Sequence, residues 1–373
     1  MSELINTQSN RAIIRWKLLT GVSALALTAH ISSTGLARAE DSDHPQVWIE
    51  LGGQMEMMQG ISSPFSAPFM FKTPTPGPYY GNIFTDGQKP PHFALGLDGK
   101  ISFQPKESDW SFSVSLRYRR SSTNRHLHHQ THPTFPSITH HIARNYFDSY
   151  ADMASTQKES HTIVDFSVGR DVGLGLFGHD GSSTIHAGVR FAQFSSSGSA
   201  VAYARPSIIP YFYFGRVLFP GFYGYSMHAQ AQRKFHGVGP SLSWDVSAAL
   251  AGNKQDGELT LDWNINGALL FGRQRTKLNH TTHAYYLPGS YYGAFYVRSL
   301  YMRSHPADRS RSVTVPNLGG SIGLSVRYPN VKISLGYRYD TFLGAMDTGI
   351  DVRKTADLTF NGPYASISIG LGG

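Results

Sequence analysis

The chain has 373 residues, a formal net charge of +8, 13% aromatic residues and no cysteine. The absence of cysteine excludes thiol catalysis and thiolate metal sites, and it suits an oxidising compartment in which free thiols are a liability. The basic residues are scattered along the chain rather than clustered, which argues against nucleic-acid binding.

The N-terminus has the features of an export signal. Basic residues precede the apolar run Leu18–Ile31, and the small-x-small sequence at residues 37–39 offers a cleavage site. An uncleaved membrane anchor is the alternative, but the apolar run is short and interrupted by small and polar residues. We therefore predict a signal peptide over residues 1–39 and a mature chain over residues 40–373.

The clearest structural pattern is a predicted hairpin between His92 and Ser121. Apolar and polar residues alternate strictly over residues 93–104 and again over residues 110–119. Each strand is about ten residues long, as a tilted strand needs to be to cross a bilayer. A soluble sandwich also alternates, but aromatic residues at the ends of the apolar rows fit the girdles of a membrane barrel better.

The same alternation predicts a strand before this hairpin and several after it, joined by short turns and long segments in turn. The other predicted strands are 47–57, 162–169, 185–191, 225–246, 258–266, 318–327, 331–340 and 365–371. The long segments are 59–91, 122–159, 195–222 and 273–316, with a fifth before the last strand.

The stretch 225–246 contains a Gly/Pro-rich element at residues 237–240, so it is either two strands or one kinked strand. One strand gives about ten strands and a strict alternation of long and short connections. Bacterial outer-membrane barrels have an even strand number, short periplasmic turns and long outer loops. The sequence thus predicts an all-β, antiparallel up-and-down transmembrane barrel in the bacterial outer membrane, with periplasmic termini. Twelve strands remain the alternative if a long segment hides a further hairpin.

Two segments carry a family resemblance. GVRFAQF at residues 188–194 and FHGVGPSLSWD at residues 235–245 resemble a porin-like, pore-forming group of Gram-negative outer-membrane barrels first recognised in Legionella. The resemblance implies passive transport across the outer membrane. Such barrels usually end on an aromatic residue that helps their assembly, whereas this sequence ends on Leu371-Gly372-Gly373.

Charges of both signs collect on the face of the strands that we predict to line the lumen. The candidate pore residues are Asp98, Lys100, Arg117, Arg119, Asp165, Arg190, Asp262, Arg327, Lys332 and Arg338. They either form a salt-bridged interior that plugs a narrow barrel or a polar constriction that selects ions and solutes. The sequence leaves both possibilities open.

Other chemistry is weakly supported. A histidine-rich segment could bind zinc or copper, but its spacing matches no recognised site, and we expect a solvated outer loop; its residues are His126, His128, His129, His132, His140 and His141. His161 lies near Asp165 in the sequence, as in a hydrolase pair, but neither G-x-S-x-G nor H-E-x-x-H occurs. We expect no enzymatic activity, no metal and no cofactor.

The predicted function is therefore a porin-like channel for passive diffusion of small hydrophilic solutes or ions. The expected partners are outer-membrane lipid and lipopolysaccharide, the barrel-assembly machinery and the solutes, and the chain is a monomer or a homo-oligomer. The alternative is a non-conducting barrel that serves as a surface adhesin or structural protein through aromatic outer loops at residues 211–214 and 285–292.

Overall fold

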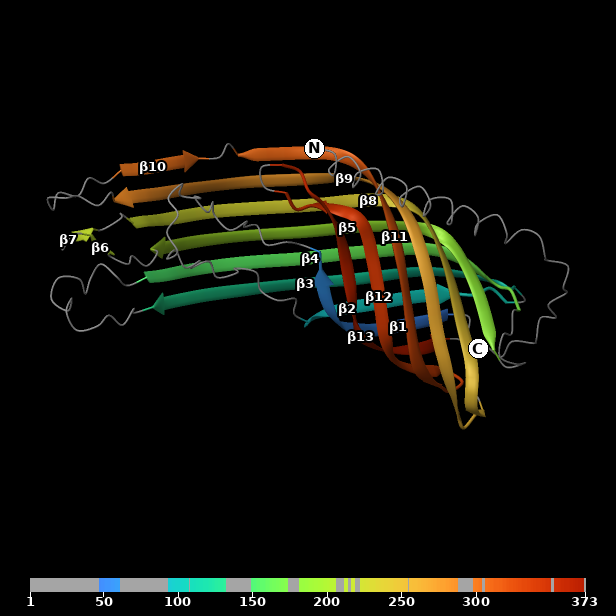
Figure 1. The fold of residues 1–373 in the computed structure, drawn as a ribbon. Helices are drawn as coiled ribbons and strands as arrows, with labels where there is room; N and C mark the ends of the chain where they lie inside the picture. The colour runs from blue at the N-terminus through green and yellow to red at the C-terminus, as the bar shows by residue number, and fades with distance from the viewer. Residues whose placement is uncertain are drawn as a thin grey trace, which may run out of the picture. The chain divides into compact units, whose positions relative to one another are not determined.

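Ten long strands form the main sheet of the computed structural model (Figure 1). Their bounds are β1 (Val47–Gln59), β2 (Phe93–Phe103), β3 (Trp110–Thr131), β4 (Ser149–Asp171), β5 (Ser182–Arg205), β8 (Phe222–Asn253), β9 (Gly257–Leu287), β11 (Ala307–Arg327), β12 (Val331–Asp347) and β13 (Thr355–Leu371). Three short strands accompany them: β6 (Tyr211–Tyr213), β7 (Arg216–Leu218) and β10 (Arg298–Arg303).

The structure describes residues 47–60, 93–106, 108–131, 149–173, 181–205, 211–213, 216–218, 222–253, 255–287, 298–303, 306–349 and 352–371. All of them belong to the unit Ser42–Gly373. The predicted signal peptide, residues 1–39, lies outside the described residues. The part of the chain that the structure describes contains no helix that is long and apolar enough to cross a bilayer.

The sheet closes on itself. Each of the ten long strands pairs antiparallel with its neighbours along the chain, and β13 pairs with β1 to complete the ring. β10 extends the sheet beside β9, while β6 and β7 form a separate small hairpin. The predicted fold class, an antiparallel up-and-down barrel of ten strands, is confirmed, and the alternative of twelve ring strands is not observed among the described residues.

The outward face carries the apolar rows that alternation predicted. Leu95, Leu97 and Ile101 of β2 are 67%, 60% and 55% exposed, although all are strongly hydrophobic. A band of exposed aliphatic side chains around a closed barrel is the lipid-facing surface of a membrane protein. Trp110 and Tyr118 stand at the two ends of the exposed row of β3, as interfacial aromatics do.

β8 settles the ambiguous stretch in favour of one strand. It runs without interruption from Phe222 to Asn253 and pairs with β5 through the Gly/Pro-rich element. Its apolar residues change face there: Met227 and Phe235 are buried inside the ring, whereas Leu242 is 44% exposed on the outside.

The prediction of long loops is wrong for much of three segments, 122–159, 195–222 and 273–316. Strands β3, β4, β5, β9 and β11 continue well into them. These extensions rise beyond the lipid-facing band, where solvent replaces lipid on the outside. The outward residues are then polar, so no apolar row marks the strand in the sequence.

Candidate functional site in the barrel lumen

The half of the lumen next to the short turns holds a polar cavity of about 480 Å³. Serine side chains from many strands line it, and because they are small they leave space between the walls. Every residue predicted to line the lumen borders this cavity except Arg119: Asp98, Lys100, Arg117, Asp165, Arg190, Asp262, Arg327, Lys332 and Arg338.

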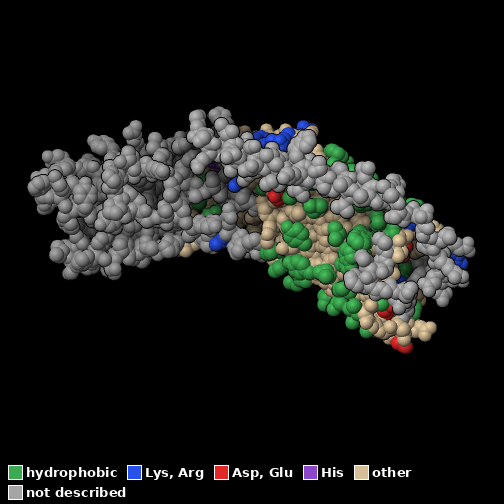
Figure 2. Space-filling view, turned by 45° about the vertical axis from the view of Figure 1, so that its right-hand side comes forward, with side chains coloured by type: hydrophobic (Ala, Val, Ile, Leu, Met, Phe, Trp, Pro, Cys, Tyr) green, Lys and Arg blue, Asp and Glu red, His purple; other side chains and the backbone are tan. Residues whose placement is uncertain are grey.

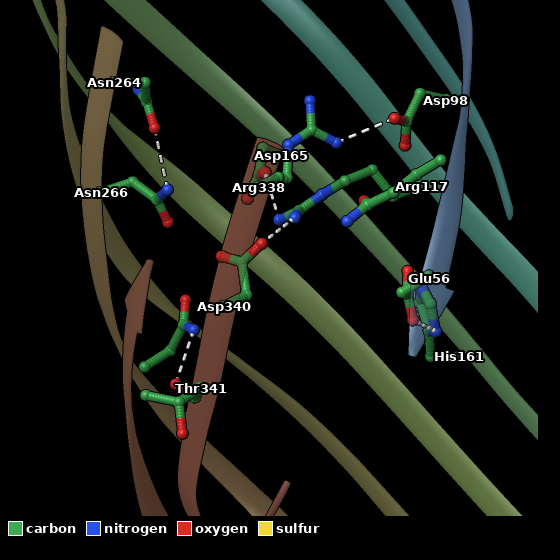
Figure 3. A network of polar contacts seen from close by, with 12 residues as sticks. Glu56, Asp98, Arg117, His161, Asp165, Asn264, Asn266, Arg338, Asp340 and Thr341 are labelled. Carbon is green, nitrogen blue, oxygen red and sulfur yellow. Dashed lines mark hydrogen bonds and ion pairs between the residues drawn. The ribbon is translucent and has the colours of Figure 1, made fainter. Parts of the chain in front are cut away.

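Ion pairs cross the lumen at the inner end of this cavity (Figure 3). Arg117 on β3 donates to Asp340 on β12 at 2.5 Å, and Arg338 on β12 donates to Asp98 on β2 at 2.8 Å. Neither pair joins neighbouring strands of the ring. These contacts therefore bridge the lumen rather than run along its wall.

Arg190 is the most connected of these cations. Its Nε and Nη2 bind the two oxygens of Asp165 at 2.6 and 3.1 Å, in the bidentate geometry that suits a guanidinium and a carboxylate. Its Nη1 donates to Asn266 at 3.0 Å and also to Asn317. One side chain thus ties β4, β5, β9 and β11 together.

Most of the other lumenal charges are also compensated. Asp262 forms an ion pair with Lys332 at 2.7 Å and accepts a hydrogen bond from the Ser247 hydroxyl at 2.6 Å. Lys100 and Arg327, in contrast, form no ion pair with any described residue within 4.0 Å. Glu50, which also lines the cavity, forms no such pair with a described residue either. Because compensated pairs largely cancel each other's field, these three groups contribute most to the potential of the cavity.

Arg119 lies beyond the cavity, in a buried group with Glu56 and His161. Arg119 Nη1 and His161 Nδ1 lie 3.6 and 3.4 Å from the same Glu56 oxygen, Oε1. The three side chains are at most 5% exposed, and the His161 ring packs on Phe360 with the centroids 4.4 Å apart. Arg119 therefore braces the wall at the level where the polar cavity ends.

Above the ion pairs, an apolar cluster fills the lumen. Its members come from every ring strand except β2 and β3: Met58, Ile163, Ala192, Phe194, Phe235, Leu270, Val315, Phe342, Ala345, Met346, Leu358 and Phe360. All are at most 8% exposed. Since all of these strands present side chains that meet one another, the cluster spans the cross-section of the barrel.

The end of the β12–β13 connection covers this cluster from the long-loop side. We call the described residues 342–349 and 352–355 the capping hairpin. Gly344 adopts a φ of +71°, which favours glycine, and the register of the two strands shifts there. Hydrogen bonds from inward side chains of β8, β9 and β11 hold its backbone. The donors Gln274, Thr276, Arg233 and Arg309 reach the carbonyl oxygens of Gly344, Asp347, Thr348 and Gly349, in that order, at 2.6, 3.3, 3.3 and 2.7 Å.

The site that we predicted from the sequence did not include this apolar cluster. Phe194, Phe342 and Phe360 follow the inward parity of their strands, two residues beyond Ala192, Asp340 and Leu358. An aromatic residue at an inward position on several strands is the signal that could have revealed it. Without the strand registers, nothing in the sequence shows that these positions share one level of the barrel.

The histidine-rich segment is not the outer loop that we predicted where it is described. His126 and His128 lie within β3, and His126 Nε2 is 2.5 Å from Asp152 on β4. Among the described residues no group of three or more candidate metal ligands comes together. His132, His140 and His141 lie outside the described residues.

A closed ring with an even number of strands, an exposed apolar band and a polar interior defines a β-barrel of the bacterial outer membrane. The chain belongs to the family of the Legionella pneumophila major outer membrane protein precursor, whose family model matches residues 79–370. Both findings place the protein in the bacterial outer membrane. No curated protein shows a significant sequence match to the chain.

Solved structures resemble the chain only remotely. The CymD monoaromatic hydrocarbon channel is 9% identical, with 88% of this chain and 90% of that chain covered and a TM-score of 0.23. The Pseudomonas putida toluene transporter TodX is 10% identical over 88% and 90%, with a TM-score of 0.20. The transport unit of the Escherichia coli autotransporter AIDA-I is 7% identical over 94% and 98%, with a TM-score of 0.18. Likenesses this low do not indicate a substrate.

Proposed function

We propose that the protein is an outer-membrane channel for small hydrophilic solutes or ions, and that it is closed at mid-barrel in the state described here. The observation that carries this proposal is the polar cavity of about 480 Å³ lined by serines and by charges of both signs. A barrel without a transport role does not require such a cavity, because inward side chains alone can fill a barrel of roughly eight strands.

The charges favour hydrophilic cargo over hydrocarbons. The described cavity wall carries Glu50, Asp98, Asp165, Asp245 and Asp262 against Lys100, Arg117, Arg190, Arg327, Lys332 and Arg338. Moving an apolar solute past such groups gains nothing, whereas water and small polar solutes can exchange hydrogen bonds with them. The near balance of signs predicts weak discrimination between anions and cations.

Opening would require the apolar cluster to separate. The capping hairpin is the part suited to move. Its tip is attached to β8, β9 and β11 by hydrogen bonds from single side chains, and not by a continuous ladder of backbone hydrogen bonds. Lifting the tip would withdraw Ala345 and Met346 from the cluster. Phe342 lies at the base of the hairpin, so a shift there would widen the path further.

The filled lumen also favours a second candidate, a non-conducting barrel that acts as a surface adhesin or structural protein. Clusters of buried aromatic side chains are stable cores, and nothing requires this one to open. The aromatic loop residues that suggested adhesion, within 211–214 and 285–292, lie mostly outside the residues whose side chains are described.

The test is single-channel conductance of the purified protein in a planar bilayer. The wild-type chain would be compared with a variant in which residues 344–349 are replaced by a shorter flexible turn. This replacement removes the four hydrogen-bond acceptors of the hairpin tip. Conductance steps in either protein, larger or more frequent in the variant, support the channel. Two folded, heat-modifiable barrels that never conduct would leave the non-conducting barrel as the function.

A further inference from the structure

The outer face of the barrel changes from apolar to polar and basic between two adjacent rows of outward-facing residues. Val164, Phe191, Val238 and Phe271 pair in register across β4, β5, β8 and β9 and form the last apolar row of the lipid-facing band. Two residues farther along each strand, on the same face, the row consists of Thr162, Gln193, His236 and Arg273. The boundary of the hydrocarbon therefore lies between these two rows.

Directly beyond this boundary the outward positions carry a concentration of cations, which we call the basic belt. Its members are Arg120, Lys158, Lys234, Arg273, Arg275 and Lys277, all exposed. Lys234 and Arg275 are register partners on β8 and β9, and Arg273 and Lys277 flank Arg275 on the same face. In Figure 2, Lys and Arg side chains likewise gather along the upper edge of the described surface, whereas hydrophobic side chains cover its lower part.

The belt is not neutralised by the acidic residues described near it. Asp308 pairs with Arg275 at 3.0 Å and with Lys277 at 3.6 Å. Arg273 donates to the Ser310 hydroxyl at 2.7 Å, and Lys234 has no ion-pair partner within 4.0 Å among the described residues. The surface keeps an excess of positive charge at the height of the headgroups of the outer leaflet.

The same face is hollowed on both sides of the belt. A hollow of about 810 Å³ lies on the lipid side, with Val164, Phe191, Val238 and Phe271 in its wall and Arg273 at its polar end. A second hollow, of about 620 Å³, lies on the solvent side and is lined by Ser, Thr, Asn and Gln side chains together with Lys158, Lys277 and one carboxylate, Asp308. Lys234 and Arg275 occupy the row between the two.

We propose that this face binds a phosphorylated glycolipid of the outer leaflet, that is, the lipid A portion of lipopolysaccharide. The order of surfaces from membrane to solvent matches that molecule. Acyl chains lie against the apolar hollow, phosphates are bound by Lys234, Arg273 and Arg275, and sugar hydroxyls face the row of amides and hydroxyls. Arginine and lysine are the side chains that bind phosphate best, and aliphatic surface at the same site gives acyl chains a dry contact.

A free phosphate ion or a second copy of the chain accounts for less of this surface. A free ion has no use for the apolar hollow below the belt. A second copy would have to present acidic groups in the same row, but the described outward positions of that row on β3, β4, β5 and β11 are Arg120, Ser160, Ser195 and Ser310. Charge complementarity thus favours the anionic lipid. The site is independent of whether the lumen conducts.

The test compares two triple variants with equal loss of charge. The belt variant carries Lys234→Gln, Arg273→Gln and Arg275→Gln. The control variant carries Lys106→Gln, Arg170→Gln and Lys354→Gln, which are exposed cations away from the belt. Binding of purified bisphosphorylated lipid A to each folded protein in detergent micelles would be measured by native mass spectrometry, with dephosphorylated lipid A and inorganic phosphate as further probes.

We expect the belt variant to lose about tenfold or more in affinity for bisphosphorylated lipid A, since it lacks three charged hydrogen-bond donors to the phosphates. The control variant should bind like wild type, and dephosphorylated lipid A should bind weakly to all three proteins. Equal binding by the belt and control variants would overturn the proposal. So would competition by inorganic phosphate at millimolar concentration, which would indicate a simple anion site.

Discussion

The rings of Phe194 and Phe360 have centroids 5.5 Å apart, although their strands, β5 and β13, lie opposite each other in the ring of ten. Phe342 joins them, at 4.6 Å from Phe194 and 5.8 Å from Phe360. Contact between opposite walls means that side chains alone close the lumen at this level. An open pore would lack such a closure, whereas a gated channel and a non-conducting barrel would both have it.

Removing two of these rings should open the path. In the double variant Phe194→Ala, Phe342→Ala we expect conductance in planar bilayers to appear or to increase several-fold. Each substitution should lower the free energy of unfolding by about 3–5 kcal/mol because it leaves a cavity, so folding must be verified by heat-modifiability. Phe112→Ala is the matched control, because Phe112 is 46% exposed on the lipid side. If a folded double variant conducts no more than this control, the cluster is not the barrier.

The ion pair between Arg117 and Asp340 should stabilise the barrel only as a pair. Asp340 is nearly fully buried, so Asp340→Asn leaves Arg117 without its nearest carboxylate and should cost about 3–5 kcal/mol. Arg117→Met combined with Asp340→Leu should restore most of this loss, because an apolar pair needs no compensation. Urea unfolding midpoints of the single and double variants provide the measurement. Additive losses would show that the two residues act separately.

Selectivity of a conducting channel should depend on the unpaired lumenal cations. Replacing Lys100 and Arg327 with Gln removes two charges that form no ion pair with described residues. The reversal potential across a salt gradient should then move toward cation preference, because the lumen becomes more negative. Arg170→Gln combined with Lys106→Gln removes equal charge outside the lumen and should leave the reversal potential unchanged. A shift of equal size in both double variants would contradict a lumenal origin.

The turn at Gly344 should be sensitive to any side chain. At a φ of +71°, alanine costs about 1–2 kcal/mol, and an added Cβ would meet Thr355 Cγ2 at 3.1 Å. Gly344→Ala should therefore loosen the capping hairpin while leaving the ring intact. Faster hydrogen exchange confined to residues 342–355 would be the evidence, and unchanged exchange there would show that the hairpin tolerates the strain. Gly99→Ala, at a site without close contacts, is the control.

Sequence alternation predicted the barrel because lipid imposes one rule on every strand. In each strand the residues that face lipid must be apolar, as Leu95, Leu97 and Ile101 are in β2, while the residues that face the lumen can be polar. Each strand can therefore be recognised from its own sequence. The parity of long and short connections then predicted the single strand β8. Where the strands leave the membrane, as in the serine-rich part of β5 around Ser197, both faces are polar and the rule no longer applies.

The sequence predicted the charged residues that line the lumen, but it did not predict the apolar cluster that closes it. Residues such as Asp165 and Arg190 were assigned to the lumen by parity alone, and the structure places them there as a bidentate pair. Which charges pair across the barrel depends on strand registers that no local pattern contains. The position of the capping hairpin depends on contacts with strands up to three places away from β12 in the ring.

Among the described residues, the unequal lengths of the strands leave one side of β3 unpaired. β2 pairs with β3 only as far as Arg119, so from Arg120 to Thr131 β3 has a described partner on one side only, β4. A free edge of this kind is where a strand from another molecule can add to a sheet. Arg120, His126 and His128 stand along it, and the two histidines lie 2.5 and 3.9 Å from Asp152 on β4. Beyond Arg119 the barrel therefore continues as an open sheet whose β3 backbone has unpaired hydrogen-bonding groups among the described residues.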